Sequence, residues 1–291
     1  IYRTVGRRSG GVNKSWLCDE GRLRFYTMER WPRLHTPAMS GEPRETATLL
    51  PVIHERFESL RAGNGDQAVA ALGSATNTNE ALFVLSRYFK GRADFRFGRE
   101  VDLYEQRQDE LLRRLDKHPN TRGAMDLGLA GPLNGLRGMR EMAEKGEIRG
   151  MWISYHPQLV GEDAPEVIDE LRRLIAALDF SVVSTTHDFE WARSASVVLP
   201  MAGWAEEQGT YTNYSGRIQV TNRAVLPPDA VAPLHVMMAD MLRLTGIEVS
   251  HDPGTIFSWL SRETPAYNGM TYDAIGALGI ASTQTPQEVL R

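Results

Sequence analysis

The chain almost lacks cysteine: Cys18 is the only one among 291 residues. A single thiol excludes a disulfide framework within the chain and suits a reducing compartment. It also excludes a complete iron–sulfur site built by this chain alone, because such clusters usually need four thiolates. On composition alone, Cys18 is best interpreted as a structural free thiol.

Other absences narrow the class of protein. No apolar run approaches the roughly 18 residues of a membrane span, so we expect no direct membrane insertion. No signal peptide is recognisable, and a net charge of -4 gives no indication of nucleic acid binding. Lysine is scarce, and arginine supplies almost all the basic charge. Arginine suits interface ion pairs, but codon bias in a GC-rich genome explains the same excess.

What is present is typical of an α/β protein. Two short apolar runs, 151–155 and 180–184, flank a segment with apolar residues at helical spacing: Val167, Ile168, Leu171, Leu174, Ile175 and Leu178. This order predicts a βαβ unit with two parallel strands. A third apolar run, 196–199, ends at Pro200, and an earlier run, 68–72, ends at Gly73 before a helical segment. The pattern predicts an α/β fold with a parallel sheet.

Two segments rich in glycine and polar residues are expected to be loops. One covers residues 120–129, and the other follows Pro200 and includes residues 209–217. A loop that leaves the carboxyl end of a parallel strand lies where open α/β sheets bind ligands. We therefore expect the second segment to be a loop placed to hold a ligand.

The helix expected at 80–89 has a polar start. Asn77 and Glu80 stand three residues apart, as in a capping box. A helix N-terminus can also bind an anion, but neither GxGxxG nor a P-loop sequence stands here. The sequence therefore favours a capping role for these two residues.

Four further polar residues are candidates for chemistry. His156 and His187 each follow a predicted strand, but a zinc site would need more ligands at a matching spacing. We expect both histidines to make loop hydrogen bonds. Glu206 and Glu207 are neighbours in sequence, which gives no convergent geometry for acid–base catalysis. We expect no catalytic residue from these patterns.

Several motifs resemble the molybdopterin oxidoreductases, a family that includes the peripheral-arm electron-transfer subunit of respiratory NADH-quinone oxidoreductase (complex I). WLCDEGRLRFY at 16–26 resembles the end of the family's iron–sulfur domain. LGSATNTNEALFVLSRYF at 72–89 is similar to its strand and helix with a G-S-x-x-x-x-N-E core, and 120–129 resembles a loop beside the cofactor. The most specific likeness is AEEQGTYTNYSGRIQV at 205–220, which matches E-x-x-G-T-x-x-N-x-x-G-R-x-Q. TPAYNGMTYDAIGALG at 264–279 resembles the tail of the complex I subunit.

This resemblance implies a domain organisation and a set of sites. Residues 1–44 would be the end of an iron–sulfur domain plus a linker, and 45–291 a Rossmann-like, parallel-sheet molybdopterin-oxidoreductase domain. Cys18 would be the last ligand of a [4Fe-4S] cluster whose other ligands lie outside this chain. If a pterin is retained, the residues implied to bind it are Asn120, Gly123, Gly209, Thr210, Asn213 and Arg217.

One departure from the family argues against a pterin. In molybdenum enzymes such as formate dehydrogenase, the segment after the G-S-x-x-x-x-N-E helix supplies a metal ligand. The corresponding residues 91–112 contain no cysteine and look shortened. We therefore expect molybdopterin to be absent. The chain opens with Ile1 rather than methionine, and residues 1–5 already look like a strand. We therefore also expect a fragment, a processed form or the carboxyl-terminal part of a larger protein.

The resemblance thus implies part of the peripheral-arm electron-transfer subunit of a respiratory NADH:quinone oxidoreductase. This segment would be mainly structural and would contact other peripheral-arm subunits, at the cytoplasmic side of the inner membrane. One alternative is a molybdopterin-dependent oxidoreductase of the formate dehydrogenase type that binds a pterin dinucleotide. Another is a non-enzymatic scaffold domain.

Overall fold

The computed structural model describes the chain except for residues 11, 98–115, 117, 130–132, 158–164 and 283–291. Its main sheet has seven strands in the order β2 (Glu42–Pro43), β1 (Ala38–Met39), β7 (Val197–Pro200), β6 (Phe180–Thr185), β5 (Gly150–Tyr155), β3 (Val69–Leu72) and β4 (Ala93–Asp94). The strands from β7 to β4 are parallel, and β1 pairs antiparallel with both β7 and β2. The expected α/β fold with a largely parallel sheet is confirmed.

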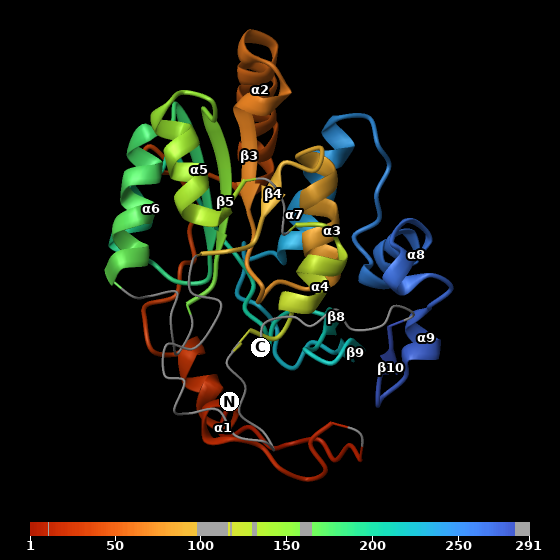
Figure 1. The fold of residues 1–291 in the computed structure, drawn as a ribbon. Coiled ribbons are helices and arrows are strands. Elements are labelled where there is room, and N and C mark those ends of the chain that lie inside the picture. Colours follow the sequence, from red (N-terminus) through yellow and green to blue (C-terminus); the bar gives the residue numbers. More distant parts are fainter. Residues whose placement is uncertain (11, 98–115, 117, 130–132, 158–164, 283–291) are drawn as a thin grey trace.

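Helices cover both faces of this sheet (Figure 1). On one face lie α2 (Thr46–Asn64), α3 (Asn79–Tyr88) and α7 (Leu234–Leu244), with α8 (Pro253–Glu263) packed on α3. On the other lie α5 (Gly135–Glu144) and α6 (Pro165–Ala177). Two hydrophobic clusters, one for each face, form the core.

The βαβ unit forms for the reasons that its sequence suggests. Every residue of β5 and β6 is buried, as expected for parallel strands covered on both faces. In α6, Leu171 and Leu174 are fully buried, and each such side chain contributes about 1.5–3 kcal/mol of transfer free energy. Trp152 is also fully buried, and its indole Nε1 donates a hydrogen bond of 2.9 Å to Ser184 Oγ.

The segment 209–217 is not a loop, contrary to the sequence prediction. It starts a second, antiparallel sheet with the order β10 (Ile280–Ala281), β9 (Arg217–Thr221) and β8 (Gly209–Thr212). Thr210 and Thr212 are buried while Tyr211 between them is partly exposed, the alternation typical of a strand. The sequence did not reveal this alternation, because the buried residues are small or carry hydroxyl groups. Their side chains are buried with hydrogen bonds and not through apolar contacts.

The segment 120–129 was also wrongly predicted as a loop. Residues Thr121–Asp126 form the short helix α4. Gly123 lies within it, where a Cβ atom would clash with the side-chain oxygens of Asn79 and Asn120. This glycine therefore serves close packing between α4 and α3 rather than a turn.

The strand order reverses its direction at the carboxyl ends of β3 and β5. After β3 the chain forms β4 on one side, and later β5 on the other. Such a reversal is the topological switch point of an open α/β sheet, outside which ligands bind.

The N-terminal residues lie at this carboxyl edge, below the main sheet in Figure 1. They include helix α1 (Asp19–Leu23). The residues around Arg33 lie beside the ends of β6 and β7. Leu34 N donates to Thr186 O over 3.2 Å, and Asp188 N donates to Pro32 O over 2.8 Å. No described helix has the length and apolarity that crossing a membrane would require.

Candidate functional site

At the switch point, the loops after β3 and β5 are joined by polar side chains. Asn77 Nδ2 donates a hydrogen bond of 2.9 Å to His156 Nε2. Asn77 Oδ1 accepts bonds from Ser74 N (2.8 Å) and Ser154 Oγ (3.2 Å). Burial, followed by the charge of Arg24, lowers the pKa of His156 to about 3, so the ring is neutral. The expected hydrogen-bonding role of His156 is confirmed.

His187, after β6, is held by the N-terminal segment. Its Nε2 donates to the Met28 carbonyl over 3.3 Å, while Thr186 Oγ1 donates to Nδ1 over 2.7 Å. Burial lowers the pKa of His187 to about 4. This ring makes the expected hydrogen bonds and also contacts the rings of Trp31 and Phe189.

An ion pair lies at the same carboxyl edge of the main sheet. Arg33 Nη2 donates to Glu206 Oε2 over 2.7 Å, and the same oxygen accepts the Gly203 N–H over 2.7 Å. Both side chains are largely buried, at 15% and 6% exposure. The chain's own N-terminal segment therefore occupies the ends of β6 and β7, on the same carboxyl edge as the switch point between β3 and β5.

Beside this edge lies the buried carboxyl group of Glu80, for which the sequence predicted a role in a capping box. The N-cap of α3 is Thr78, whose hydroxyl accepts the Ala81 N–H. Glu80 is fully buried and accepts bonds from Thr210 N (2.8 Å), Thr210 Oγ1 (2.9 Å) and Tyr272 OH (2.8 Å). Burial raises the pKa of Glu80 to about 7, although the bonds from Thr210 and Tyr272 oppose that rise.

Glu207 is a second buried carboxyl group that the sequence did not single out as a site. Burial, followed by repulsion from Glu80, raises its pKa to about 8. Its hydrogen bond from Tyr211 OH is long, at 3.5 Å. The burial therefore favours the protonated form of Glu207. The sequence signal for this residue was the Glu206–Glu207 pair, from which we expected no site.

Asn120 and Thr212 tie α4 to β8 in the same buried region. Asn120 Oδ1 accepts the Thr212 N–H over 2.7 Å, and Asn120 Nδ2 donates to Asn77 O over 2.8 Å. Asn79 Nδ2 donates to Thr210 Oγ1 and Thr212 Oγ1 over 3.0 and 3.2 Å. We call Asn79, Glu80, Asn120, Thr210 and Thr212 the buried polar network.

The structure brings together only part of the implied pterin site. Asn120, Gly123, Gly209 and Thr210 meet at the buried polar network. Asn213 lies in the turn between β8 and β9, and Arg217 is the first residue of β9. Asn213 Oδ1 accepts the N–H groups of Ser215 and Arg217, and Arg217 Nη1 donates to Gly279 O over 2.7 Å.

These residues fit a structural role and do not fit a pterin. The polar atoms of Asn120 and Thr210 are engaged with protein groups. A Cβ atom at Gly209 would lie 2.5 Å from Thr78 Cγ2 and 2.8 Å from Glu80 Oε2. The four residues that meet thus offer neither free hydrogen-bonding groups nor room for a bulky ligand.

Cys18 begins α1 as its N-cap and is half-buried. Its Sγ accepts the Gly21 N–H at 3.4 Å. Within the described part of the chain, no three His, Cys, Asp or Glu side chains gather into a metal site. Cys18 can therefore contribute one thiolate to a cluster whose remaining ligands come from elsewhere.

Part of the chain is similar to a known protein family. Residues 107–230 match the family model "Molybdopterin oxidoreductase". A subunit of the NADH-quinone oxidoreductase of Rhizobium meliloti is 28% identical over 215 residues, which cover 61% of this chain and 25% of that protein. F420-dependent formate dehydrogenase 2 subunit alpha of Methanococcus maripaludis is 31% identical, over 45% of this chain and 20% of that protein. The corresponding subunit of Methanocaldococcus jannaschii is 31% identical, over 51% and 22%.

The chain spans a fifth to a quarter of the length of these relatives. The likeness to a subunit of NADH-quinone oxidoreductase and to formate dehydrogenases is of similar strength. These relatives therefore share a region of sequence with this chain, and they do not indicate one specific role. Residues 107–230 of the chain are thus similar to a molybdopterin oxidoreductase domain.

Proposed function

We propose that this chain is a structural segment of the peripheral-arm electron-transfer subunit of a respiratory NADH:quinone oxidoreductase, and that it binds no pterin. The observation that carries the proposal is the buried polar network. The most specific family motif, at 205–220, supplies Thr210 and Thr212 to internal hydrogen bonds. Hydrogen bonds of this kind stabilise the fold, and they support a structural role for the motif rather than cofactor binding.

The N-terminal segment supports the same proposal. The Arg33–Glu206 ion pair lies at the carboxyl edge of the sheet, with both partners largely buried. Separating these two charges would destabilise the fold by several kcal/mol, because it would leave a buried charge without its partner. A pterin entering there would have to displace this segment.

Cys18 has its own place in the proposal. Its sulfur would be one thiolate of a [4Fe-4S] cluster, with the other ligands outside this chain. A cluster of this kind accepts and donates one electron, and N–H groups that donate to its sulfurs tune the potential. The Gly21 N–H already donates to Cys18 Sγ.

The alternative with support is an oxidoreductase of the formate dehydrogenase type, since such proteins are 31% identical to this chain. A non-enzymatic scaffold domain is the third candidate. Co-purification of the native protein with its neighbours tests all three. We expect it in a complex that oxidises NADH with a quinone, attached to the inner membrane at its cytoplasmic side without inserting. Recovery with formate-oxidising activity, or as an isolated protein with no redox partner, would contradict the proposal.

A further inference from the structure

The sequence contains three pairs of asparagine followed by glycine: Asn64 with Gly65, Asn134 with Gly135, and Asn268 with Gly269. Asparagine is a thermolabile residue. It loses its side-chain ammonia most readily before glycine, which has no Cβ to keep its main-chain nitrogen away from the asparagine side chain. The hydrogen bonds around the three pairs differ, and they separate one pair from the other two.

The first pair is fixed at the end of α2. Gly65 N donates a hydrogen bond of 2.7 Å to Arg61 O. The Asn64 side chain is also held, because its Nδ2 donates to Leu60 O over 3.1 Å and its Oδ1 accepts a bond of 2.6 Å from Arg149 Nη1. Both the nitrogen and the side-chain amide that would have to react are therefore engaged.

The second pair is fixed at the start of α5. Gly135 is buried, and its N–H donates to Asp94 Oδ2 over 3.0 Å. A Cβ atom at Gly135 would lie 2.6 Å from Arg96 O, so this glycine is closely packed. The Asn134 side chain is exposed, but the nitrogen beside it is held by a charge-assisted hydrogen bond, which is a strong one.

The third pair has no such bonds. Asn268 and Gly269 are exposed, at the centre of a turn that is closed by a hydrogen bond of 3.0 Å from Met270 N to Tyr267 O. The angles φ -54° and ψ 128° at Asn268 and φ 76° at Gly269 are those of a type II turn. Among the described residues, no group bonds to the Asn268 side chain or to the peptide group between Asn268 and Gly269.

This peptide group can rotate without breaking a hydrogen bond. Its rotation converts a type II turn toward type I, and both turn types have the same closing bond. Gly269 permits the change, because a Cβ atom there would meet nothing within 4 Å and glycine adopts negative and positive φ. The same rotation sets how near Gly269 N comes to Asn268 Cγ.

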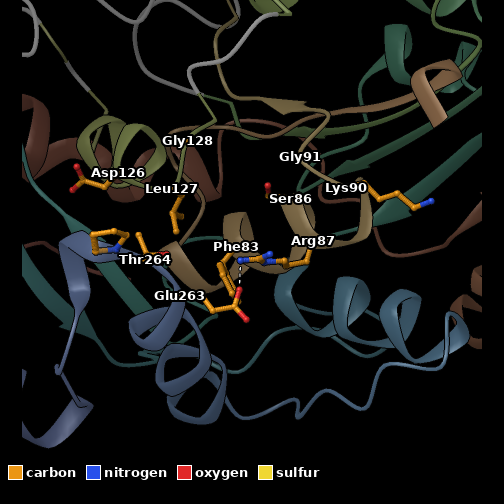
Figure 2. A pocket seen from close by; sticks show the side chains of 11 residues that line it. Phe83, Ser86, Arg87, Lys90, Gly91, Asp126, Leu127, Gly128, Glu263 and Thr264 are labelled. Carbon is orange, nitrogen blue, oxygen red and sulfur yellow. Dashed lines mark hydrogen bonds and ion pairs between the residues drawn. The ribbon is translucent and has the colours of Figure 1, made fainter.

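The chain on either side of this rotating group is anchored. Before the turn, Glu263 at the end of α8 pairs with Arg87 of α3, as Figure 2 shows. At the start of the turn, Tyr267 is fully buried, and its OH lies 2.8 Å from the hydroxyl of Thr212 in the buried polar network. A change in the main-chain length of the turn would therefore act on Tyr267.

We propose that Asn268 is a site of spontaneous deamidation, and that its isoaspartate product loosens the turn that holds Tyr267. Gly269 N bonds to Asn268 Cγ, the Cγ–Nδ2 bond breaks, and ammonia leaves with the proton from Gly269 N. Water then opens the succinimide ring at either carbonyl carbon, which gives aspartate or isoaspartate. Only isoaspartate adds a carbon to the main chain between Tyr267 and Met270. This modification does not depend on the proposed function.

Peptide mapping of the full chain after incubation in mildly alkaline buffer tests the site. Each pair lies in its own tryptic peptide, so mass spectrometry measures the three rates in one sample. We expect Asn268 to deamidate at least about tenfold faster than Asn64 or Asn134, because those pairs must first break hydrogen bonds. In the urea-unfolded chain the three rates should be similar. Equal rates in the folded chain, or the same excess at Asn268 in the unfolded chain, would overturn the proposal.

Thermal unfolding of the incubated protein tests the consequence. Its midpoint should fall as isoaspartate accumulates. Asn268→Gln, which closes such a ring far less readily, should keep its midpoint through the same incubation, whereas Asn134→Gln should decline as the unsubstituted chain does. Asn268→Asp carries the charge without the extra main-chain carbon and should unfold like fresh protein. An equal decline in Asn268→Gln, or a midpoint that stays constant while isoaspartate accumulates, would contradict the role of this turn.

Discussion

Glu80 and Thr210, 130 residues apart in the chain, are joined by two hydrogen bonds: the Thr210 N–H and hydroxyl each donate to one carboxyl oxygen of Glu80. This pair attaches the first turn of α3 to β8. It also connects the two family motifs, since Glu80 lies in the segment 72–89 and Thr210 in the segment 205–220. The motifs therefore contact each other within the fold.

Removing the Thr210 hydroxyl should destabilise the protein. Thr210→Val keeps the side-chain volume and the main-chain bond but removes a buried bond to Glu80 and the acceptor for Asn79. We expect a loss of about 1–3 kcal/mol in the free energy of unfolding, because a buried acceptor loses its donor. Urea denaturation measures it. Thr221→Val, at the partly exposed end of β9, should change stability by no more than about 0.5 kcal/mol, and equal effects of the two substitutions would refute the argument.

Gly209 should not tolerate even one methyl group. In Gly209→Ala the new Cβ would lie 2.5 Å from Thr78 Cγ2, and such overpacking costs about 1–3 kcal/mol. Thermal unfolding should show a lower midpoint. Gly63→Ala provides the control, because a Cβ there meets nothing within 4 Å and the residue lies in helix α2. An unaltered midpoint for Gly209→Ala would mean that the β8–α3 contact is looser than described.

Buried Glu207 should make stability fall as pH rises. Its pKa is raised from 4.5 to about 8, so the folded state keeps a proton that the unfolded chain releases above pH 4.5. The stability that this provides is complete below pH 4.5 and lost by about pH 8. Glu80, with its pKa raised to about 7, acts in the same direction.

The buried His156 gives the opposite slope. Because its pKa falls from 6.5 to about 3, its stabilising contribution is present above pH 6.5 and lost as pH falls toward 3. Unfolding free energies should therefore be highest between about pH 4.5 and 6.5. Glu207→Gln should reduce the decline above pH 6.5, whereas Glu248→Gln at an exposed position should not. An identical alkaline decline in all three proteins would show that Glu207 does not carry the effect.

Cys18 gives a spectroscopic prediction. If its thiolate completes a [4Fe-4S] cluster in the native protein, Cys18→Ser should abolish or strongly alter one iron–sulfur signal in electron paramagnetic resonance. The remaining signals of the complex serve as the internal control. An unchanged spectrum would show that Cys18 is only a thiol that caps α1.

The fold was largely predictable, because its evidence is local. Leu171, Leu174 and Ile175 recur at helical spacing between two apolar runs, and these became α6, β5 and β6. The site was less predictable. Glu80 resembles a capping residue in its local sequence, and its partners Thr210 and Tyr272 lie 130 and 192 residues away. No local pattern could indicate that a carboxylate there would be fully buried.

The structure brings together some of the residues that the family motif implied. Asn120, Gly123, Gly209 and Thr210 meet, while Asn213 lies in the hairpin turn and Arg217 begins β9. A motif records which residues occur together, but it does not distinguish a residue that contacts a cofactor from one that holds a strand in place.

The central claim is that the part of this chain that is similar to a molybdopterin oxidoreductase domain holds no pterin. Elemental analysis of the purified native protein, together with assay of acid-extracted pterin fluorescence, tests this most directly. We predict molybdenum and tungsten far below one atom per chain and no extractable pterin. Stoichiometric molybdenum or tungsten with one pterin dinucleotide or more per chain would contradict the account.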